Sequence, residues 1–133
     1  MSHFTQVETK INDLVALKAA IEEMGLSIEE AEVGQVVKVR GWKGSTLTAD
    51  ASIKATKSYD IGVQQNSDGT YKLVADWWGI EEETNEKAEV LQQKLIRTYA
   101  KHKVKNEVIK QGFTLDEEAI AEDGTVKLSV SKW

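Results

Sequence analysis

The chain has 133 residues, of which 41% are hydrophobic, so it can bury one core and is too short for two independent ones. We therefore expect a single domain spanning residues 1–133. Its 17 basic and 22 acidic residues give a formal net charge of −5, which disfavours binding to nucleic acid or to anionic lipid. The absence of cysteine excludes disulfides, thiol catalysis and iron–sulfur ligation by this chain.

The N-terminal part of the chain predicts a short strand followed by a helix. The opening residues lack a basic segment before an apolar run, so we expect no signal peptide and a soluble, intracellular protein. No apolar run is long enough for a bilayer span, and we expect no membrane insertion. Phe4 to Lys10 has the alternation of a strand, and Asn12 is placed to cap a helix that ends at Gly25.

The middle of the chain has the period of an antiparallel sheet. Val36 to Arg40 is a β-branched run, and residues 49–55 and 59–63 alternate between apolar and polar. Asn66 to Gly69 predicts a hairpin turn, because its Asp-Gly pair tolerates the positive φ of a tight reversal. The segment from Tyr71 to Ala75 is then the returning strand, and the strict alternation predicts one buried face.

A long helix is predicted from about Glu82 to Gln111. Most of its apolar residues share one face, while Val90, Val104 and Val108 fall roughly opposite, so we expect the helix to touch a second surface. The acidic run from Glu81 to Glu83 complements the positive N-terminal end of this helix.

Two further strands, one from Phe113 and one ending at Val130, complete the order β-α-β-β-β-β-α-β-β. Two helices on one face of a mainly antiparallel sheet bury these patterns most simply, so the predicted fold class is α+β. The predicted core consists of Leu14, Leu17, Ile21, Ile53, Ile61, Val63, Leu73, Leu95, Tyr99, Val126, Leu128 and Val130.

Five blocks of sequence carry a resemblance to a known family. They are Met1 to Ile11, Tyr59 to Gly62, Leu73 to Gly79, Tyr99 to His102, and Gln111 to Phe113. Together they resemble the hypothetical chloroplast reading frame thirty-five family of cyanobacteria, algal plastids and some cyanobacterial viruses. The resemblance runs nearly end to end and implies a cytoplasmic protein of the cyanobacterial cytosol or the plastid stroma. It implies no reaction, because the family has no assigned biochemical activity.

The sequence shows no complete catalytic or metal-binding constellation. Zinc requires three or four His or Cys ligands, and this chain has two distant histidines. The segment Gly41 to Thr46 fails as a phosphate loop, because its lysine precedes the glycine and a strand follows. No serine occupies a nucleophile elbow. We therefore expect no metal and no cofactor, and the sequence favours a protein that is not an enzyme.

His102 is the best single candidate for a functional polar residue. It lies on the apolar face of the long helix beside Tyr99, and a general acid or base needs an orienting partner such as Tyr99, Asp60 or Asp76. This leaves open an enzyme or small-ligand binder with a pocket lined by Asp60, Asp76, Tyr99 and His102. The alternative is a half-buried histidine that is hydrogen-bonded to the sheet.

The four tryptophans carry the leading functional hypothesis. Trp42, Trp77, Trp78 and Trp133 all fall at turns or at the ends of elements. Tryptophan near arginine or lysine is typical of interface anchors, although one of the adjacent pair must be partly core if both lie in a strand. We therefore predict a protein-interaction, assembly or regulatory module whose partner is another protein or a second copy of the chain.

Overall fold

The computed structural model describes residues 3–120 and 126–132, with side chains for residues 3–112. The predicted α+β class is confirmed, and strands β2 and β4 and helix α2 are additions to the predicted order. The elements are β1 (Thr5–Glu8), α1 (Leu14–Glu23), β2 (Ser27–Glu30), β3 (Val37–Arg40), η1 (Trp42–Gly44), β4 (Thr46–Ala49), β5 (Ala51–Lys54), β6 (Asp60–Gln65), β7 (Tyr71–Ala75), α2 (Trp77–Thr84), α3 (Ala88–Lys110), β8 (Phe113–Ile120) and β9 (Val126–Lys132).

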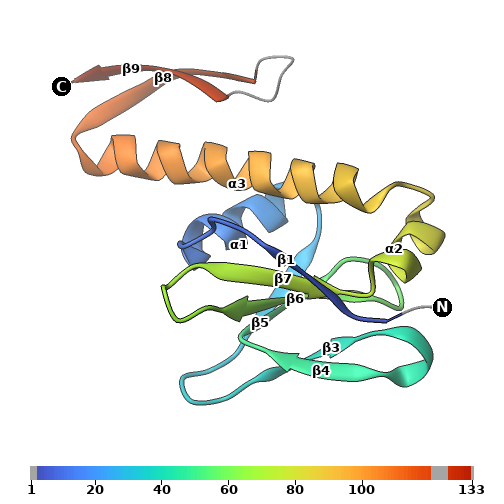
Figure 1. Ribbon diagram of the computed structural model, residues 1–133. Coiled ribbons are helices and arrows are strands. Elements are labelled where there is room, and N and C mark those ends of the chain that lie inside the picture. The colour runs from blue at the N-terminus through green and yellow to red at the C-terminus, as the bar shows by residue number, and fades with distance from the viewer. Residues whose placement is uncertain (1–2, 121–125, 133) are drawn as a thin grey trace.

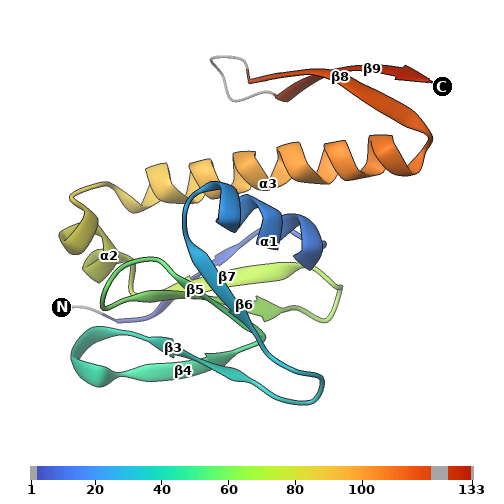
Figure 2. The ribbon, with the colours of Figure 1, turned by 180° about the vertical axis from the view of Figure 1, so that it is seen from behind.

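The molecule is built in layers around a central antiparallel sheet with the strand order β1-β7-β6-β5-β2. Helices α1 and α3 cover one face of this sheet, and the two-stranded ribbon β3–β4 lies against the other face (Figure 1). The second ribbon, β8–β9, lies along α3 on the side away from the central sheet, as the view from behind also shows (Figure 2). The long helix therefore has neighbours on two sides, as its two apolar faces predict.

The core lies between the helices and the central sheet. Alternate residues of β5, β6 and β7 point into it, which is why the period-two pattern identified them. The predicted core residues Leu17, Ile21, Ile53, Ile61, Val63, Leu73, Leu95 and Tyr99 are buried, and Leu14 is partly buried. Val126, Leu128 and Val130 belong to the part of the chain whose side chains are not described.

The predicted hairpin between β6 and β7 is confirmed. The Asn66 N–H donates to the Thr70 carbonyl at 2.7 Å, and Gly69 has φ +88°, which favours glycine. The cap of α1 differs from the prediction by one residue. Asp13 caps the helix through a 3.1 Å hydrogen bond from the Ala16 N–H, whereas Asn12 contacts α3 instead.

The predicted long helix is divided into α2 and α3. Asn85 adopts a left-handed conformation with φ +57° and ends α2. The Glu81 carboxylate accepts a 2.7 Å hydrogen bond from the Ala88 N–H, so an acidic residue of α2 satisfies a free donor at the start of α3. Glu81 therefore has the role predicted for the acidic run, whereas the Glu83 carboxylate accepts from Thr56 and Ser58 instead.

We predict that Leu95→Ala lowers the free energy of unfolding by about 2–5 kcal/mol, because it removes a side chain that is 1% exposed in the core. Ile96→Ala is the matched control, since the next residue of α3 is 39% exposed and should cost less than about 1 kcal/mol. Urea denaturation followed by circular dichroism measures both. An equal loss of unfolding free energy in the two variants would show that α3 does not turn its Leu95 face toward the core.

Candidate functional site

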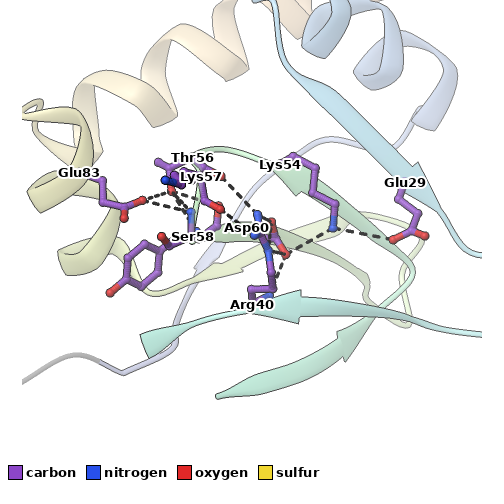
Figure 3. A network of polar contacts seen from close by, with 9 residues as sticks. Glu29, Arg40, Lys54, Thr56, Lys57, Ser58, Asp60 and Glu83 are labelled. Carbon is purple, nitrogen blue, oxygen red and sulfur yellow. Dashed lines mark hydrogen bonds and ion pairs between the residues drawn. The ribbon is translucent and has the colours of Figure 1, made fainter. Parts of the chain in front are cut away.

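A buried carboxylate joins the β3–β4 ribbon to the central sheet. Asp60, at the start of β6, is completely buried, and the Arg40 side chain at the end of β3 donates to both of its oxygens at 2.8–3.1 Å. The Arg40 backbone N–H adds a further bond to Asp60 Oδ2 at 2.8 Å. Such a bidentate arrangement combines charge with fixed geometry, so it sets the position of β3 relative to β6 (Figure 3).

The surrounding charges keep the Asp60 carboxyl ionised. Burial alone would raise its pKa, but the hydrogen bonds from Arg40 and the nearby charge of Lys54 outweigh burial and lower it. Lys54 Nζ lies 3.4 Å from Asp60 Oδ2 and 3.8 Å from Glu29 Oε1. The network therefore extends from β3 through β6 and β5 to the edge strand β2.

The same network reaches helix α2 at its other end. Arg40 also donates to the carbonyls of Thr56 and Lys57, at 3.3 and 2.7 Å. The Thr56 hydroxyl donates to Glu83 Oε1 at 2.6 Å, and the Ser58 N–H donates to the same oxygen at 3.2 Å. The turn before β6 thus holds the ribbon on one side and α2 on the other (Figure 3).

Two glycines allow close packing around this network. A Cβ at Gly62 would lie 2.8 Å from a methyl carbon of Val39, so the glycine lets the ribbon approach the sheet. A Cβ at Gly79, in α2, would overlap the Tyr59 ring. Tyr59 and Gly79 belong to two of the sequence blocks that carry the family resemblance, and these two blocks therefore pack against each other beside the network.

Trp77 and Trp78 occupy the first turn of α2 and not the end of a strand. Asp76 caps this helix by accepting from the Gly79 N–H at 3.0 Å, and Asp76 is 1% exposed. Trp77 is 9% exposed, and its indole N–H donates to the Thr5 carbonyl of β1 at 2.9 Å. Trp77 is therefore a core residue that holds β1, and it does not belong to an exposed interface.

Trp78 and Trp42 are the tryptophans that face solvent among the described residues. Trp78 is 50% exposed and Trp42 is 39% exposed. Lys43 Nζ lies 4.6 Å from the centre of the Trp42 ring, which is a cation–π contact. Trp133 lies outside the described residues.

The N-terminal segment connects the elements that carry these two tryptophans. A Cβ at Gly41, next to Trp42, would overlap the Phe4 ring, so Phe4 packs directly on the start of η1. One residue later, the Thr5 carbonyl accepts from Trp77, which is next to Trp78 in α2. In both ribbon views η1 and α2 lie at the same end of the molecule as the N-terminus. We call Phe4, Trp42, Lys43 and Trp78 the tryptophan end.

Tyr99 and His102 lie on α3, across the central sheet from the Arg40–Asp60 pair. The Tyr99 hydroxyl accepts from the Asn12 N–H at 3.1 Å, and His102 Nε2 lies 3.0 Å from Glu23 Oε1. The structure therefore brings these two candidates onto the contact between α3 and α1, while Asp60 and Asp76 serve the ribbon and the cap of α2. The four predicted pocket residues have separate sets of partners.

Glu23 also binds the buried Lys101, whose Nζ lies 2.5 and 2.6 Å from its two carboxylate oxygens. The hydrogen bond from Lys101 is the main reason that the pKa of Glu23 is lowered, and the contact with His102 acts in the same direction. This cluster fastens the end of α1 to α3. Within the described residues, no three His, Asp or Glu side chains gather in a way that could hold a metal ion.

Sequence reasoning missed Arg40, Thr56 and Glu83 as members of one network. The local signals were a single arginine at the end of a strand and a carboxylate at the start of another. Neither signal identifies the other residue as its partner, because Arg40 and Asp60 are 20 residues apart.

We predict that Asp60→Asn lowers the free energy of unfolding at neutral pH by about 1.5–3 kcal/mol, the range for hydrogen bonds to charged groups. Asp68→Asn is the control, because the Asp68 carboxylate accepts from the neighbouring Thr70 within the exposed hairpin turn and joins no distant elements in the described part of the chain. Chemical denaturation of the three proteins measures the difference. Equal stability of the wild type and Asp60→Asn would contradict the proposed constraint.

The Asp60 contribution should also depend on pH. Because its pKa is lower in the folded chain than in the unfolded chain, the unfolded chain takes up the proton first as pH falls. The stabilisation is therefore complete above the ordinary aspartate pKa of about 4, and it is lost as the pH falls through the lower pKa that Asp60 has in the folded chain. The stability difference between the wild type and Asp60→Asn should shrink on acidification, and a difference that grows would be evidence against this assignment.

Comparison with known proteins finds relatives that align with the whole chain. It is 32% identical over 135 residues to the uncharacterized protein ycf35 of Cyanophora paradoxa and 34% identical over 143 residues to that of Pyropia yezoensis. Each alignment covers 100% of this chain and 98% of the relative. No solved structure matches the chain.

A family model described as "Protein of unknown function (DUF1257)" matches residues 20–129, which include the Arg40–Asp60 pair and both exposed tryptophans. None of the helices in the described part of the chain combines the length and the apolar character needed to cross a membrane. The resemblance stated from the sequence blocks is confirmed. The chain belongs to the ycf35 family of plastid and cyanobacterial proteins.

Proposed function

We propose that this protein is a protein-interaction module and that the tryptophan end is its contact surface. The observation that supports this most directly is the half-exposed Trp78 in the first turn of α2, beside a buried Trp77 that holds the helix against β1. A large aromatic ring left in water on a fixed support is typical of an interface anchor.

The free energy available from these side chains favours a covered state. Burial of apolar surface contributes about 25 cal/mol per Å², and a tryptophan presents up to about 250 Å². Covering the exposed parts of Trp78 and Trp42 would therefore contribute on the order of a few kcal/mol to binding. Lys43 adds a positive charge beside Trp42, so the surface suits a partner with an apolar patch next to an acidic group.

The support beneath the surface is rigid, which lowers the entropic cost of binding. The Arg40–Asp60 pair fixes the ribbon that carries Trp42, and the Thr56–Glu83 contact fixes the helix that carries Trp78. Side chains mounted on elements that are already held in place lose little freedom when a partner docks. We infer that the partner is a different protein, and that this chain acts in its assembly or regulation.

A small-ligand binder is the second candidate, and a groove between α1 and α3 favours it. The groove has a volume of about 440 Å³ and is lined by Asp13, Val15, Asn106, Ile109 and Lys110. It begins one helical turn beyond His102, although neither His102 nor Tyr99 lines it. Its mixture of apolar and charged side chains would suit a small amphipathic molecule.

We predict that Trp78→Ala weakens partner capture while leaving the fold intact. The test is affinity capture from a cyanobacterial or plastid lysate with the wild-type chain, Trp78→Ala, Trp42→Ala and Val90→Ala as baits, with captured proteins quantified by mass spectrometry. Val90→Ala is the matched control, because Val90 is an apolar side chain on α3 that is 48% exposed and is not one of the residues of the tryptophan end.

The expected result is a protein that is captured by the wild type and Val90→Ala and depleted several-fold with both tryptophan variants. Unchanged capture by both tryptophan variants, with circular dichroism spectra like the wild type, would rule out the tryptophan end as the contact surface. Ile109→Asp is a further bait that changes the groove. A protein that both tryptophan variants capture and Ile109→Asp does not would identify the groove as the contact surface.

A further inference from the structure

The β8–β9 ribbon leaves long strand edges without a partner. The strands have eight and seven residues, whereas the edge strands β1 and β2 of the central sheet have four residues each. Within the described part of the chain, no third strand pairs with either edge of the ribbon. An isolated two-stranded ribbon is marginally stable in water, and an open strand edge is a template for pairing with another strand.

We propose that the outer edge of β9 pairs with β9 of a second copy of the chain. The two ribbons then form one continuous four-stranded antiparallel sheet across a twofold axis. This surface is separate from the tryptophan end, and the proposal does not depend on the proposed function.

The sequence of β9 fits pairing with itself. Ser129 is the midpoint of Val126–Lys132, so an antiparallel twofold centred there pairs Ser129 with its own copy. In this register Leu128 lies opposite Val130, Lys127 lies opposite Ser131, and no lysine lies opposite a lysine. The central apolar pair is therefore matched and like charges are kept apart, which are conditions that favour cross-strand pairing, while the end pair places Val126 opposite Lys132.

The other strand of the ribbon does not fit pairing with itself. The twofold of such a pair passes through a residue and its own copy, and the two central residues of β8 are Asp116 and Glu117. Either choice would place a carboxylate directly opposite the same carboxylate of the second copy, and directly opposed like charges are destabilising. The ladder between β8 and β9 is also irregular between Leu115 and Glu117. Bulges and charges are the usual means by which proteins block a strand edge. The open edge therefore belongs to β9.

The helix beneath the ribbon gives a second reason for a wider sheet. Both strands contact α3, and β8 does so more extensively. Val104, in the half of α3 from which β8 continues and on the face opposite the core face, nevertheless remains 45% exposed. A four-stranded sheet built from two ribbons would cover more of this apolar surface than one ribbon does, and burial of that surface favours the pair.

The first test is the oligomeric state of the full-length chain and of Ser129→Lys, measured by sedimentation at micromolar concentrations. The wild type should be a dimer. In Ser129→Lys the new lysine would lie opposite Glu117 within its own ribbon and opposite the same lysine across the twofold axis. The substitution should therefore spare the ribbon and raise the dimer dissociation constant about tenfold or more. Thr114→Lys, on β8, introduces the same charge and should leave the dimer unchanged.

The second test uses the absence of natural cysteines in the chain. Ser129→Cys should form a covalent dimer under mild oxidation, because cross-strand Cα separations of about 4.5–5.5 Å fall within the range of disulfides. Thr114→Cys is the control and should remain largely uncrosslinked. Trp78→Ala should dimerise like the wild type, which separates this surface from the tryptophan end.

A wild type that is monomeric throughout the micromolar range would overturn the proposal. A dimer that resists Ser129→Lys, or that crosslinks equally well through Thr114→Cys, would also overturn it, because the two copies would then meet through another surface.

Discussion

The arrangement of this protein around its tryptophan end depends on one carboxylate that has no contact with water. Asp60 is buried as an ion, and it remains one because the Arg40 side chain and backbone supply hydrogen bonds to both oxygens. Without such partners a buried carboxyl group would take up a proton, and its burial would be costly. The ion pair therefore determines where the β3–β4 ribbon can lie on the central sheet.

The close contacts near this ion pair follow from that position. Gly62 lets Val39 of the ribbon reach the sheet, and Gly79 lets the Tyr59 ring lie against α2. A side chain at either position would separate elements that the polar network holds together. The glycines permit the same close approach that the ion pair stabilises. Such agreement between local and tertiary preferences is expected of a well-defined fold. The result is a rigid support for the exposed rings of Trp42 and Trp78.

The two proposed contact surfaces lie on different sides of the molecule. The β3–β4 ribbon and the β8–β9 ribbon are separated by the central sheet and by α3 (Figure 1). Two copies joined through β9 would each keep a free tryptophan end, so the dimer would be bivalent. A bivalent protein gains avidity for a partner that carries two binding sites, provided that the geometry allows both contacts at once.

The sequence by itself determined the elements whose signals are local. Period-two alternation identified β6 and β7, the Asp-Gly pair identified their turn, and helical spacing placed Leu95 and Tyr99 in the core. The tertiary structure alone decided which distant polar groups meet. Arg40 and Asp60 are 20 residues apart, and Glu23 and His102 are 79 residues apart. It also decided which tryptophan is buried, because Asp76 starts a helix where alternation suggested a strand. Periodicity records only which face of an element is apolar, whereas the partner of a charged group depends on how those faces are brought together.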